Sequence, residues 1–421
     1  MGAFVIRGCE IYLGGAFVPA ELEVRGGVVT ALGGGIVPGE GASVYNFKNC
    51  IVVPGLADVH VHLREPGFSY KETVASGTLA AARSGYAALC AMPNLSPVPE
   101  DAATLAQELE IIRRDAVIDV LPYGAITRGQ RGEQLADMSA MSPYVCGFSD
   151  DGRGVQSREL MRAAMLEAKR LGKPIAAHCE DNSLLRGGYI HAGEYAKAHG
   201  HRGICSESEW GPIARDIELL RETGCAYHVC HISTAESAAL IRSAKAEGLD
   251  ITCETAPHYL LLSDSDLQED GRFKMNPPLR SERDRLALIE ALRDGTIDIL
   301  ATDHAPHSRE EKSRGLAGSA FGITGLETAF PLLWTGLVEP GIITRERLVE
   351  LMSTAPARRF GIESGIEPGG PATFAVFETE TTYRIDPERF ASKGRATPFA
   401  GREVRGRCVL NIVRGREVWR A

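Results

Sequence analysis

The sequence lacks an excess of positive charge. Its 421 residues carry 46 lysines and arginines against 55 aspartates and glutamates, which gives a formal net charge of -9. Proteins that bind nucleic acid or anionic membranes usually present a basic surface, so neither partner is favoured. An anionic substrate would need positive charge supplied locally by the binding site.

Long apolar runs and cysteine pairs are also missing. No stretch approaches the roughly 20 apolar residues of a transmembrane helix, and the opening MGAFVIRG lacks the charged head and long apolar core of a signal peptide. The 10 cysteines contain no Cys-x-x-Cys pair, and many lie in apolar runs. This usage is typical of buried, reduced thiols in a cytoplasmic enzyme.

From residue 51 onward, short apolar runs alternate with amphipathic stretches. The runs lie near residues 51–58, 86–92, 117–126, 143–149, 173–179, 225–231, 250–256 and 297–302. Strand–helix alternation of this length predicts a parallel sheet covered by helices, and about eight units predict a (β/α)8, TIM-like barrel. A doubly wound open sheet is the alternative, but no Gly-x-Gly-x-x-Gly follows the first strand to support a dinucleotide site.

The two ends of the chain differ from this α/β repeat. Residues 1–52 contain short β-like pieces broken by glycine, and Gly26-Gly27 is typical of a hairpin turn. β-like segments return after residue 360. We therefore predict that residues 53–360 form the barrel, and that residues 1–52 and 361–421 together form one small β-sandwich domain.

The first barrel strand leads into a histidine pair, His60 and His62. Residues i and i+2 of a strand point to the same face, so the two imidazoles would lie side by side and could share a metal ion. Taken alone, the pair is equally compatible with a half-buried strand that carries two solvated histidines.

Other polar residues follow the later apolar runs. They are one aspartate of the pair Asp150-Asp151 after the fourth run, His178 after the fifth, His231 after the sixth and Asp303 after the eighth. Each has an ordinary structural explanation, such as a turn or a helix cap. However, the carboxyl ends of barrel strands meet at one face, where catalytic groups gather. Four histidines and two aspartates there would suit zinc, and two ions sharing one carboxylate would use all six groups.

Several motifs resemble those of the class I dihydroorotases, within the amidohydrolase superfamily. They are PGLADVHVHLREPG at 54–67, YKET at 70–73, MPN at 92–94, SDDG at 149–152, MNPPLR at 275–280 and TDHAPH at 302–307. Together they span nearly the whole chain, and as a set they are highly specific.

The resemblance implies roles for individual residues. The implied metal ligands, for one or two Zn2+ ions, are His60, His62, Asp151, His178, His231 and Asp303. Asp151 would be the bridging carboxylate because it directly precedes the glycine, as in the family block. The implied substrate-binding groups are His62, Arg64, Asn94, Asn276, His307 and the backbone at Phe321 and Gly322.

The activity implied by the resemblance is the reversible cyclisation of N-carbamoyl-L-aspartate to L-dihydroorotate, in de novo pyrimidine (UMP) biosynthesis. In the hydrolytic direction, a metal-bound hydroxide would attack the ring amide and Asp303 would act as general acid and base. A homodimer and an aspartate transcarbamoylase partner are further expectations from the family.

Two alternatives remain at this point. Hydantoinases and allantoinases are similar cyclic-amide hydrolases, but they usually bridge their metals with a carboxylated lysine, and the fourth run offers Asp151 and no lysine. A non-catalytic homologue associated with aspartate transcarbamoylase is expected to have lost metal ligands, whereas this chain keeps all six. A chain with a complete site that needs this partner for activity stays open.

Overall fold

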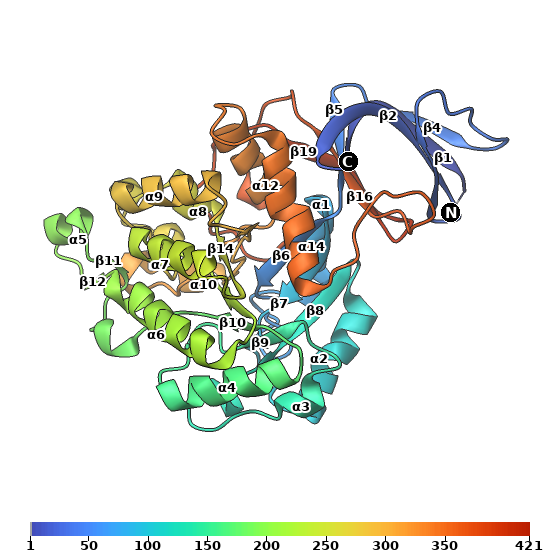
Figure 1. Cartoon of the computed structure of the whole chain (residues 1–421). Helices are drawn as coiled ribbons and strands as arrows, with labels where there is room; N and C mark the ends of the chain where they lie inside the picture. Colours follow the sequence, from blue (N-terminus) through green and yellow to red (C-terminus); the bar gives the residue numbers. More distant parts are fainter. Residues whose placement is uncertain (1) are drawn as a thin grey trace.

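Eight parallel strands form a nearly closed barrel in the structure, a computed structural model that describes residues 2–421 (Figure 1). They are β6 (Leu56–Val61), β7 (Tyr86–Ala91), β8 (Asp119–Ala125), β9 (Gly147–Ser149), β10 (Ile175–Ala177), β13 (Tyr227–Val229), β14 (Ile251–Thr255) and β15 (Ile299–Leu300). Each strand pairs with the next, and a parallel bridge between Val61 and His304 joins the first strand to the segment after the last. The predicted barrel is confirmed.

Amphipathic helices surround the barrel. The longer ones are α1 (Val74–Arg83), α2 (Ala102–Asp115), α4 (Arg158–Arg170), α6 (Glu207–Thr223), α7 (Ala235–Ala246) and α9 (Glu282–Arg293). In α4, Ser157 caps the first turn by accepting from the Leu160 amide, and Met161, Met165 and Ala168 are buried on one face. None of the helices within residues 2–421 combines the length and the apolar character needed to cross a membrane.

Short helices connect these units and complete the barrel. They are α3 (Met138–Met141), α5 (Glu194–His199), α8 (Pro257–Leu261), α10 (Arg309–Lys312), α11 (Gly315–Gly318), α12 (Ala329–Leu333), α13 (Arg345–Val349) and α14 (Ala355–Phe360). α12 continues into a π-helical turn at Trp334–Val338, and a second such turn at Glu350–Thr354 joins α13 to α14. Figure 1 shows α5 projecting from the body of the molecule beside the short strands β11 (Ile190–His191) and β12 (Gly203–Ile204).

Both chain ends contribute to a second sheet, which curves beside the barrel in Figure 1. Its strands are β1 (Phe4–Leu13), β2 (Ala16–Arg25), β3 (Val28–Gly33), β4 (Ser43–Asn46), β5 (Cys50–Pro54), β16 (Phe374–Glu378), β19 (Arg407–Val413) and β20 (Arg416–Arg420). The β2–β3 hairpin turns at Gly26-Gly27, as predicted. A separate apolar core includes Leu22, Val52 and Phe374. The prediction of a separate β domain made from both ends is confirmed. A small pair, β17 (Tyr383–Arg384) and β18 (Glu403–Val404), lies apart from this sheet.

The apolar run predicted as one strand over residues 51–58 is in fact two strands in different sheets. β5 pairs with β1 and β16 in the small sheet, whereas β6 belongs to the barrel. The chain changes sheets at Gly55, where an added Cβ would lie 2.4 Å from the Cβ of Ala87. Periodicity could not reveal this break, because both strands are buried. The predicted boundary at residue 52 falls inside β5, and the three-part division by residue number stays a prediction.

Asn411 on β19 links the small sheet to the barrel. This residue is fully buried, and its Nδ2 donates to the carbonyl oxygens of Ala82 (2.9 Å) and Tyr86 (2.8 Å), at the end of α1 and the start of β7. Asn411→Ala should lower the free energy of unfolding by about 1–3 kcal/mol, because the Ala82 and Tyr86 carbonyls both lose the buried Asn411 donor, although Ala82 keeps a backbone hydrogen bond from Gly85. Urea denaturation measures this loss. The exposed Asn182→Ala is the control, and equal losses in both variants would contradict the assignment.

Candidate metal centre and substrate pocket

The six predicted metal ligands come together at one end of the barrel. His60 and His62 lie at the end of β6, Asp151 follows β9, His178 follows β10, His231 follows β13 and Asp303 follows β15. All six side chains are buried, with at most 6% of any residue exposed. Parallel strands therefore deliver imidazoles and carboxylates from distant parts of the sequence to one point.

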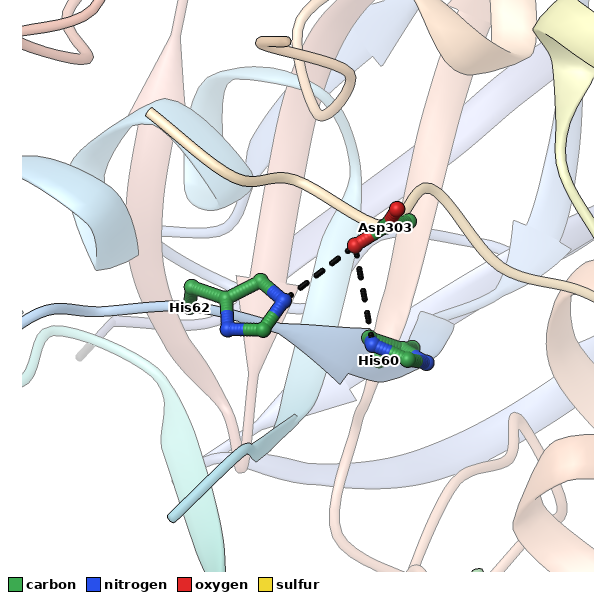
Figure 2. Close-up of side chains that lie close together, drawn as sticks. All are labelled: His60, His62 and Asp303. Atoms are coloured by element: carbon green, nitrogen blue, oxygen red, sulfur yellow. Dashed lines mark hydrogen bonds and ion pairs between the residues drawn. The ribbon is translucent and has the colours of Figure 1, made fainter. Parts of the chain in front are cut away.

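Asp303 lies beside the histidine pair, as Figure 2 shows. Its Oδ1 is 3.2 Å from His62 Nε2 and 3.6 Å from His60 Nε2. Asp151 approaches the same two nitrogens from β9, at 3.3 Å from His60 Nε2 and 3.5 Å from His62 Nε2. Two carboxylates and two imidazoles thus surround one small volume.

Asp151 also contacts the other two histidines. Its Oδ1 lies 3.5 Å from His178 Nδ1 and 3.4 Å from His231 Nε2, and these two nitrogens are 2.9 Å apart. Asp151 is therefore the group shared between the pair on β6 and the pair from β10 and β13.

This geometry fits divalent metal ions. His60 Nε2 and Asp151 Oδ1 are buried and have no hydrogen-bond partner in the protein, although such groups are normally satisfied. Two ligands bound to one tetrahedral zinc at about 2.0–2.1 Å lie roughly 3.3 Å apart, which matches the spacing of these atoms. The mixed nitrogen and oxygen donors are also those that zinc accepts.

Both carboxylates of the cluster favour the ionised form although they are buried. Burial alone would raise the pKa of Asp151, but the charge of His60 and the close approach of the His178, His231 and His60 imidazoles hold it well below its usual range. Burial likewise opposes ionisation of Asp303, and hydrogen bonding to His62 and nearby imidazole charge lower the pKa of this carboxyl. Ionised carboxylates in a buried site require positive charge beside them.

Glu254 at the end of β14 supports the centre and was not predicted from the sequence. Its Oε1 accepts from His60 Nδ1 at 2.7 Å, and its Oε2 lies 3.1 Å from His228 Nε2. Because Glu254 holds Nδ1 of His60, the Nε2 atom is left to face Asp151 and Asp303. An acidic residue inside the apolar run ITCET was a hint that Glu254 has a special role. The sequence could not show that its partner is His60.

Arg64 and His307 lie together beside the centre. Arg64 is 8% exposed, its Nε donates to the Pro306 carbonyl oxygen (3.3 Å), and its Nη2 is 3.3 Å from His307 Nε2. Burial lowers the pKa of Arg64 to about 10, so the guanidinium stays charged at neutral pH. Burial and the charges of Arg64 and Lys71 lower the pKa of His307 to about 3, so this imidazole is neutral.

Asn94 and Asn276 lie on either side of the cluster. Asn94 Oδ1 accepts from His62 Nδ1 (2.8 Å), which leaves His62 Nε2 to face Asp303. Asn276 Nδ2 donates to Glu180 Oε1 (2.9 Å), and its buried Oδ1 has no partner in the protein. Glu180 Oε2 lies 3.5 Å from His178 Nε2, so Glu180 connects Asn276 to a predicted ligand. This role of Glu180 was not predicted from the sequence.

The backbone at Phe321 and Gly322 is partly engaged within the protein. The Phe321 carbonyl accepts from His307 Nε2 (2.7 Å), and the Gly322 amide donates to the Lys274 carbonyl (3.1 Å). These two groups are therefore paired with protein atoms in this structure. A contact between the backbone here and a substrate ring stays a prediction.

Three residues of the site have a backbone in the left-handed region. Arg64, His231 and Asp303 have φ angles of 61°, 35° and 48°. Residues other than glycine adopt this conformation rarely, and such strain concentrates at functional sites. This left-handed conformation turns the chain sharply after three of the strands. Neither composition nor periodicity predicts such a conformation.

Comparisons with known proteins identify similar sequences over the whole chain. A family model described as "Dihydro-orotase-like" matches residues 49–237. The dihydroorotase of Bacillus caldolyticus is 46% identical over 422 residues, covering 100% of this chain and 99% of that protein. The dihydroorotase of Geobacillus kaustophilus (strain HTA426) is 47% identical over 423 residues, with the same two coverages.

Solved structures with a similar fold have lower sequence identity. The L-hydantoinase (dihydropyrimidinase) from Arthrobacter aurescens has a TM-score of 0.88 at 25% identity, covering 100% of this chain and 96% of that chain. The dihydropyrimidinase from Brevibacillus agri NCHU1002 has a TM-score of 0.86 at 22% identity, covering 99% and 95%. These likenesses agree with the barrel and the separate β sheet.

Replacement of Glu254 tests whether this cluster binds metal. Glu254→Gln should weaken metal affinity about 10- to 100-fold, because the carboxylate that orients His60 is lost. Competition with a chelator, followed by metal analysis of the protein, measures this change. Asp298→Asn is the matched control, since Asp298 pairs with Lys245 (2.6 Å) before β15, at the other end of the barrel. Equal losses of affinity in the two variants would contradict the role of Glu254.

Proposed function

The chain belongs to the dihydroorotase family, and on that premise we propose that it interconverts N-carbamoyl-L-aspartate and L-dihydroorotate in pyrimidine biosynthesis. Membership confirms the resemblance inferred from the sequence motifs and makes the protein a cyclic amidohydrolase. The observation that carries the choice of substrate is the buried guanidinium of Arg64 beside the metal cluster. Dihydroorotate carries a carboxylate that this cation can bind, whereas unsubstituted hydantoin carries none.

We propose zinc as the metal, with one or two ions. The residues that would hold it are His60, His62, Asp151, His178, His231 and Asp303. When bound, a divalent cation of this kind polarises the amide carbonyl and lowers the pKa of water to about 7. The orphaned buried atoms of His60 and Asp151 support this proposal.

Asp303 is proposed as the general acid and base. Its carboxyl has a pKa lowered by His62 and His60 against the effect of burial, so it is ionised at neutral pH and can accept a proton. In hydrolysis, a C–O bond forms and the ring C–N bond breaks. Asp303 takes the proton from the attacking water and gives it to the leaving nitrogen. Cyclisation uses the same steps in reverse.

The remaining side chains are proposed to bind the substrate. Arg64 can form two parallel hydrogen bonds with a carboxylate, and it supplies positive charge that the acidic protein otherwise lacks. His307 lies beside Arg64 and Asn94 contacts His62, and we propose that both contribute to the carboxylate site. Asn276 offers a free carbonyl oxygen, because Glu180 holds its amide group, and this oxygen can accept from a ring N–H.

A cytoplasmic location is part of the same proposal. All ten cysteines are free thiols, and nine of them are buried, which suits a reducing compartment. The homodimer and the aspartate transcarbamoylase partner stay predictions from the family. A hydantoinase-type activity is the alternative, because hydantoinases are among the solved structures with the same fold.

An assay of the purified chain tests the proposed activity. We expect the metal-loaded protein to hydrolyse L-dihydroorotate in the absence of any partner, and to turn over hydantoin or dihydrouracil at least about 100-fold more slowly. The decrease in ultraviolet absorbance as the ring amide is hydrolysed measures each rate. Preferential turnover of hydantoin would contradict the substrate assignment. Bound metal without turnover of any of these substrates, restored by added aspartate transcarbamoylase, would indicate partner dependence.

Asp303→Asn tests the proton-transfer role. Its kcat should fall by at least about 100-fold, because the amide cannot accept the proton, while the circular dichroism spectrum stays unchanged. Metal content is measured in the same samples, since Asp303 is also a proposed ligand. Near-normal turnover in metal-loaded Asp303→Asn would exclude it as the general base.

Arg64→Ala tests carboxylate binding. The loss of a charge-assisted pair should raise KM for L-dihydroorotate by about 10- to 100-fold, with less effect on kcat. A substrate analogue without the carboxylate provides the control, because its kinetics should be equal in the two proteins. A fall in kcat at unchanged KM would contradict this role.

A further inference from the structure

The turn that carries Asp303 is strained and requires support from its neighbours. Its φ of 48° lies in the left-handed region, which side chains other than glycine occupy at a cost in free energy. Such a conformation persists only where flanking contacts fix it. The residues immediately before and after Asp303 are therefore the place to look for groups that determine its orientation.

Thr302 is fixed on the N-terminal side of this turn. Both carboxylate oxygens of the fully buried Asp58 accept from the Thr302 amide at 3.2 Å. The Thr302 hydroxyl in turn accepts from the His304 amide at 3.0 Å. The first barrel strand thus holds one side of the turn.

His304 is fixed on the C-terminal side through its backbone and its imidazole. Its carbonyl accepts from the His62 amide at 2.8 Å, which closes the barrel. Its Nδ1 accepts from the Gly325 amide at 3.1 Å, so the ring proton is on Nε2. That Nε2 faces Glu72 Oε2 at 3.4 Å.

Glu72 joins this imidazole to a distant part of the chain. The carboxylate is fully buried, and it accepts from the Ser392 hydroxyl and from the Lys393 amide at 3.2 Å. Both donors belong to residues 391–397, here called the C-terminal arm. Within the arm, Gly394 packs so closely that an added Cβ would lie 2.8 Å from Pro306 Cβ, next to the strained turn.

A second, largely buried carboxylate anchors the start of the arm. Glu327 accepts from the amides of Ala391 (2.9 Å) and Ser392 (3.2 Å). Further along, the Ala396 carbonyl accepts from the Thr324 amide at 2.9 Å. The arm is therefore bonded along its length to the loops that follow β6 and β15, although it comes from beyond the barrel.

We propose that Glu72 and the C-terminal arm are positioning elements for Asp303. By holding the imidazole of His304, they fix the turn that directs the Asp303 carboxylate toward the histidine pair. Neither Glu72 nor Ser392 contacts the cluster, so neither is a catalytic residue. The inference rests on the proposed role of Asp303, but its structural part is independent of the substrate.

Ser392→Ala tests this inference, with Ser353→Ala as the matched control. Ser353 is also a buried serine, and its hydroxyl donates to the backbone of Pro54 and Gly55, at the opposite end of β6. Ser392→Ala should lower kcat for L-dihydroorotate by about 10- to 100-fold, because a small misplacement of a catalytic group has this effect. KM should stay within about twofold of the wild type, because the substrate-binding groups have not moved. Metal content is measured in the same samples, since Asp303 is also a proposed ligand, and kcat is compared at equal metal loading. Ser353→Ala should lose comparable thermal stability and keep its kcat.

Amide hydrogen exchange gives a second readout that does not depend on turnover. Peptides covering residues 299–307 should exchange faster in Ser392→Ala and in Glu72→Gln than in the wild type, and at the wild-type rate in Ser353→Ala. Unchanged exchange in both Ser392→Ala and Glu72→Gln would overturn the inference. Equal losses of kcat in Ser392→Ala and Ser353→Ala would also overturn it. If the wild type lacks dihydroorotase activity but exchange changes as expected, the proposed function fails and the positioning of the turn stands.

Discussion

Asp151 is the group on which the geometry of this protein depends. Its two oxygens lie between 3.3 and 3.5 Å from nitrogens of His60, His62, His178 and His231, which come from three different strands. Burying a carboxylate and four imidazoles costs free energy unless each charge is compensated and each polar atom has a partner. These groups can compensate one another only if the strands end at nearly the same height along the barrel axis. The barrel must also close, as it does between Val61 and His304.

The imidazoles are oriented by groups that lie behind them. Glu254 holds Nδ1 of His60, Asn94 holds Nδ1 of His62, and Glu180 faces Nε2 of His178. Each outer group determines which nitrogen faces Asp151, so the directions of these three rings are set by the protein itself. Asn94 is itself a predicted substrate-binding group, and Glu180 accepts a hydrogen bond from Asn276, which is another.

Strand-end residues made the cluster predictable from the sequence. A barrel brings the carboxyl ends of its strands together, so His60, Asp151 and Asp303 could be grouped without knowing their coordinates. The change of sheet at Gly55 was not predictable, because two buried strands in succession look like one apolar run. Glu254 and Glu72 were also missed, since their importance lies in partners such as His60 and Ser392, which only tertiary folding brings near.

The small sheet affects when the protein can finish folding during its synthesis. β5 pairs with β16 and β16 with β19, so strands from the first and last parts of the chain lie side by side. During synthesis on the ribosome, β5 has an unpaired edge until almost the entire polypeptide has emerged. Contacts so distant in sequence form slowly, and an exposed strand edge is prone to wrong association. Until β16 has left the exit tunnel, the nascent chain therefore exposes a strand edge that can pair wrongly with other chains.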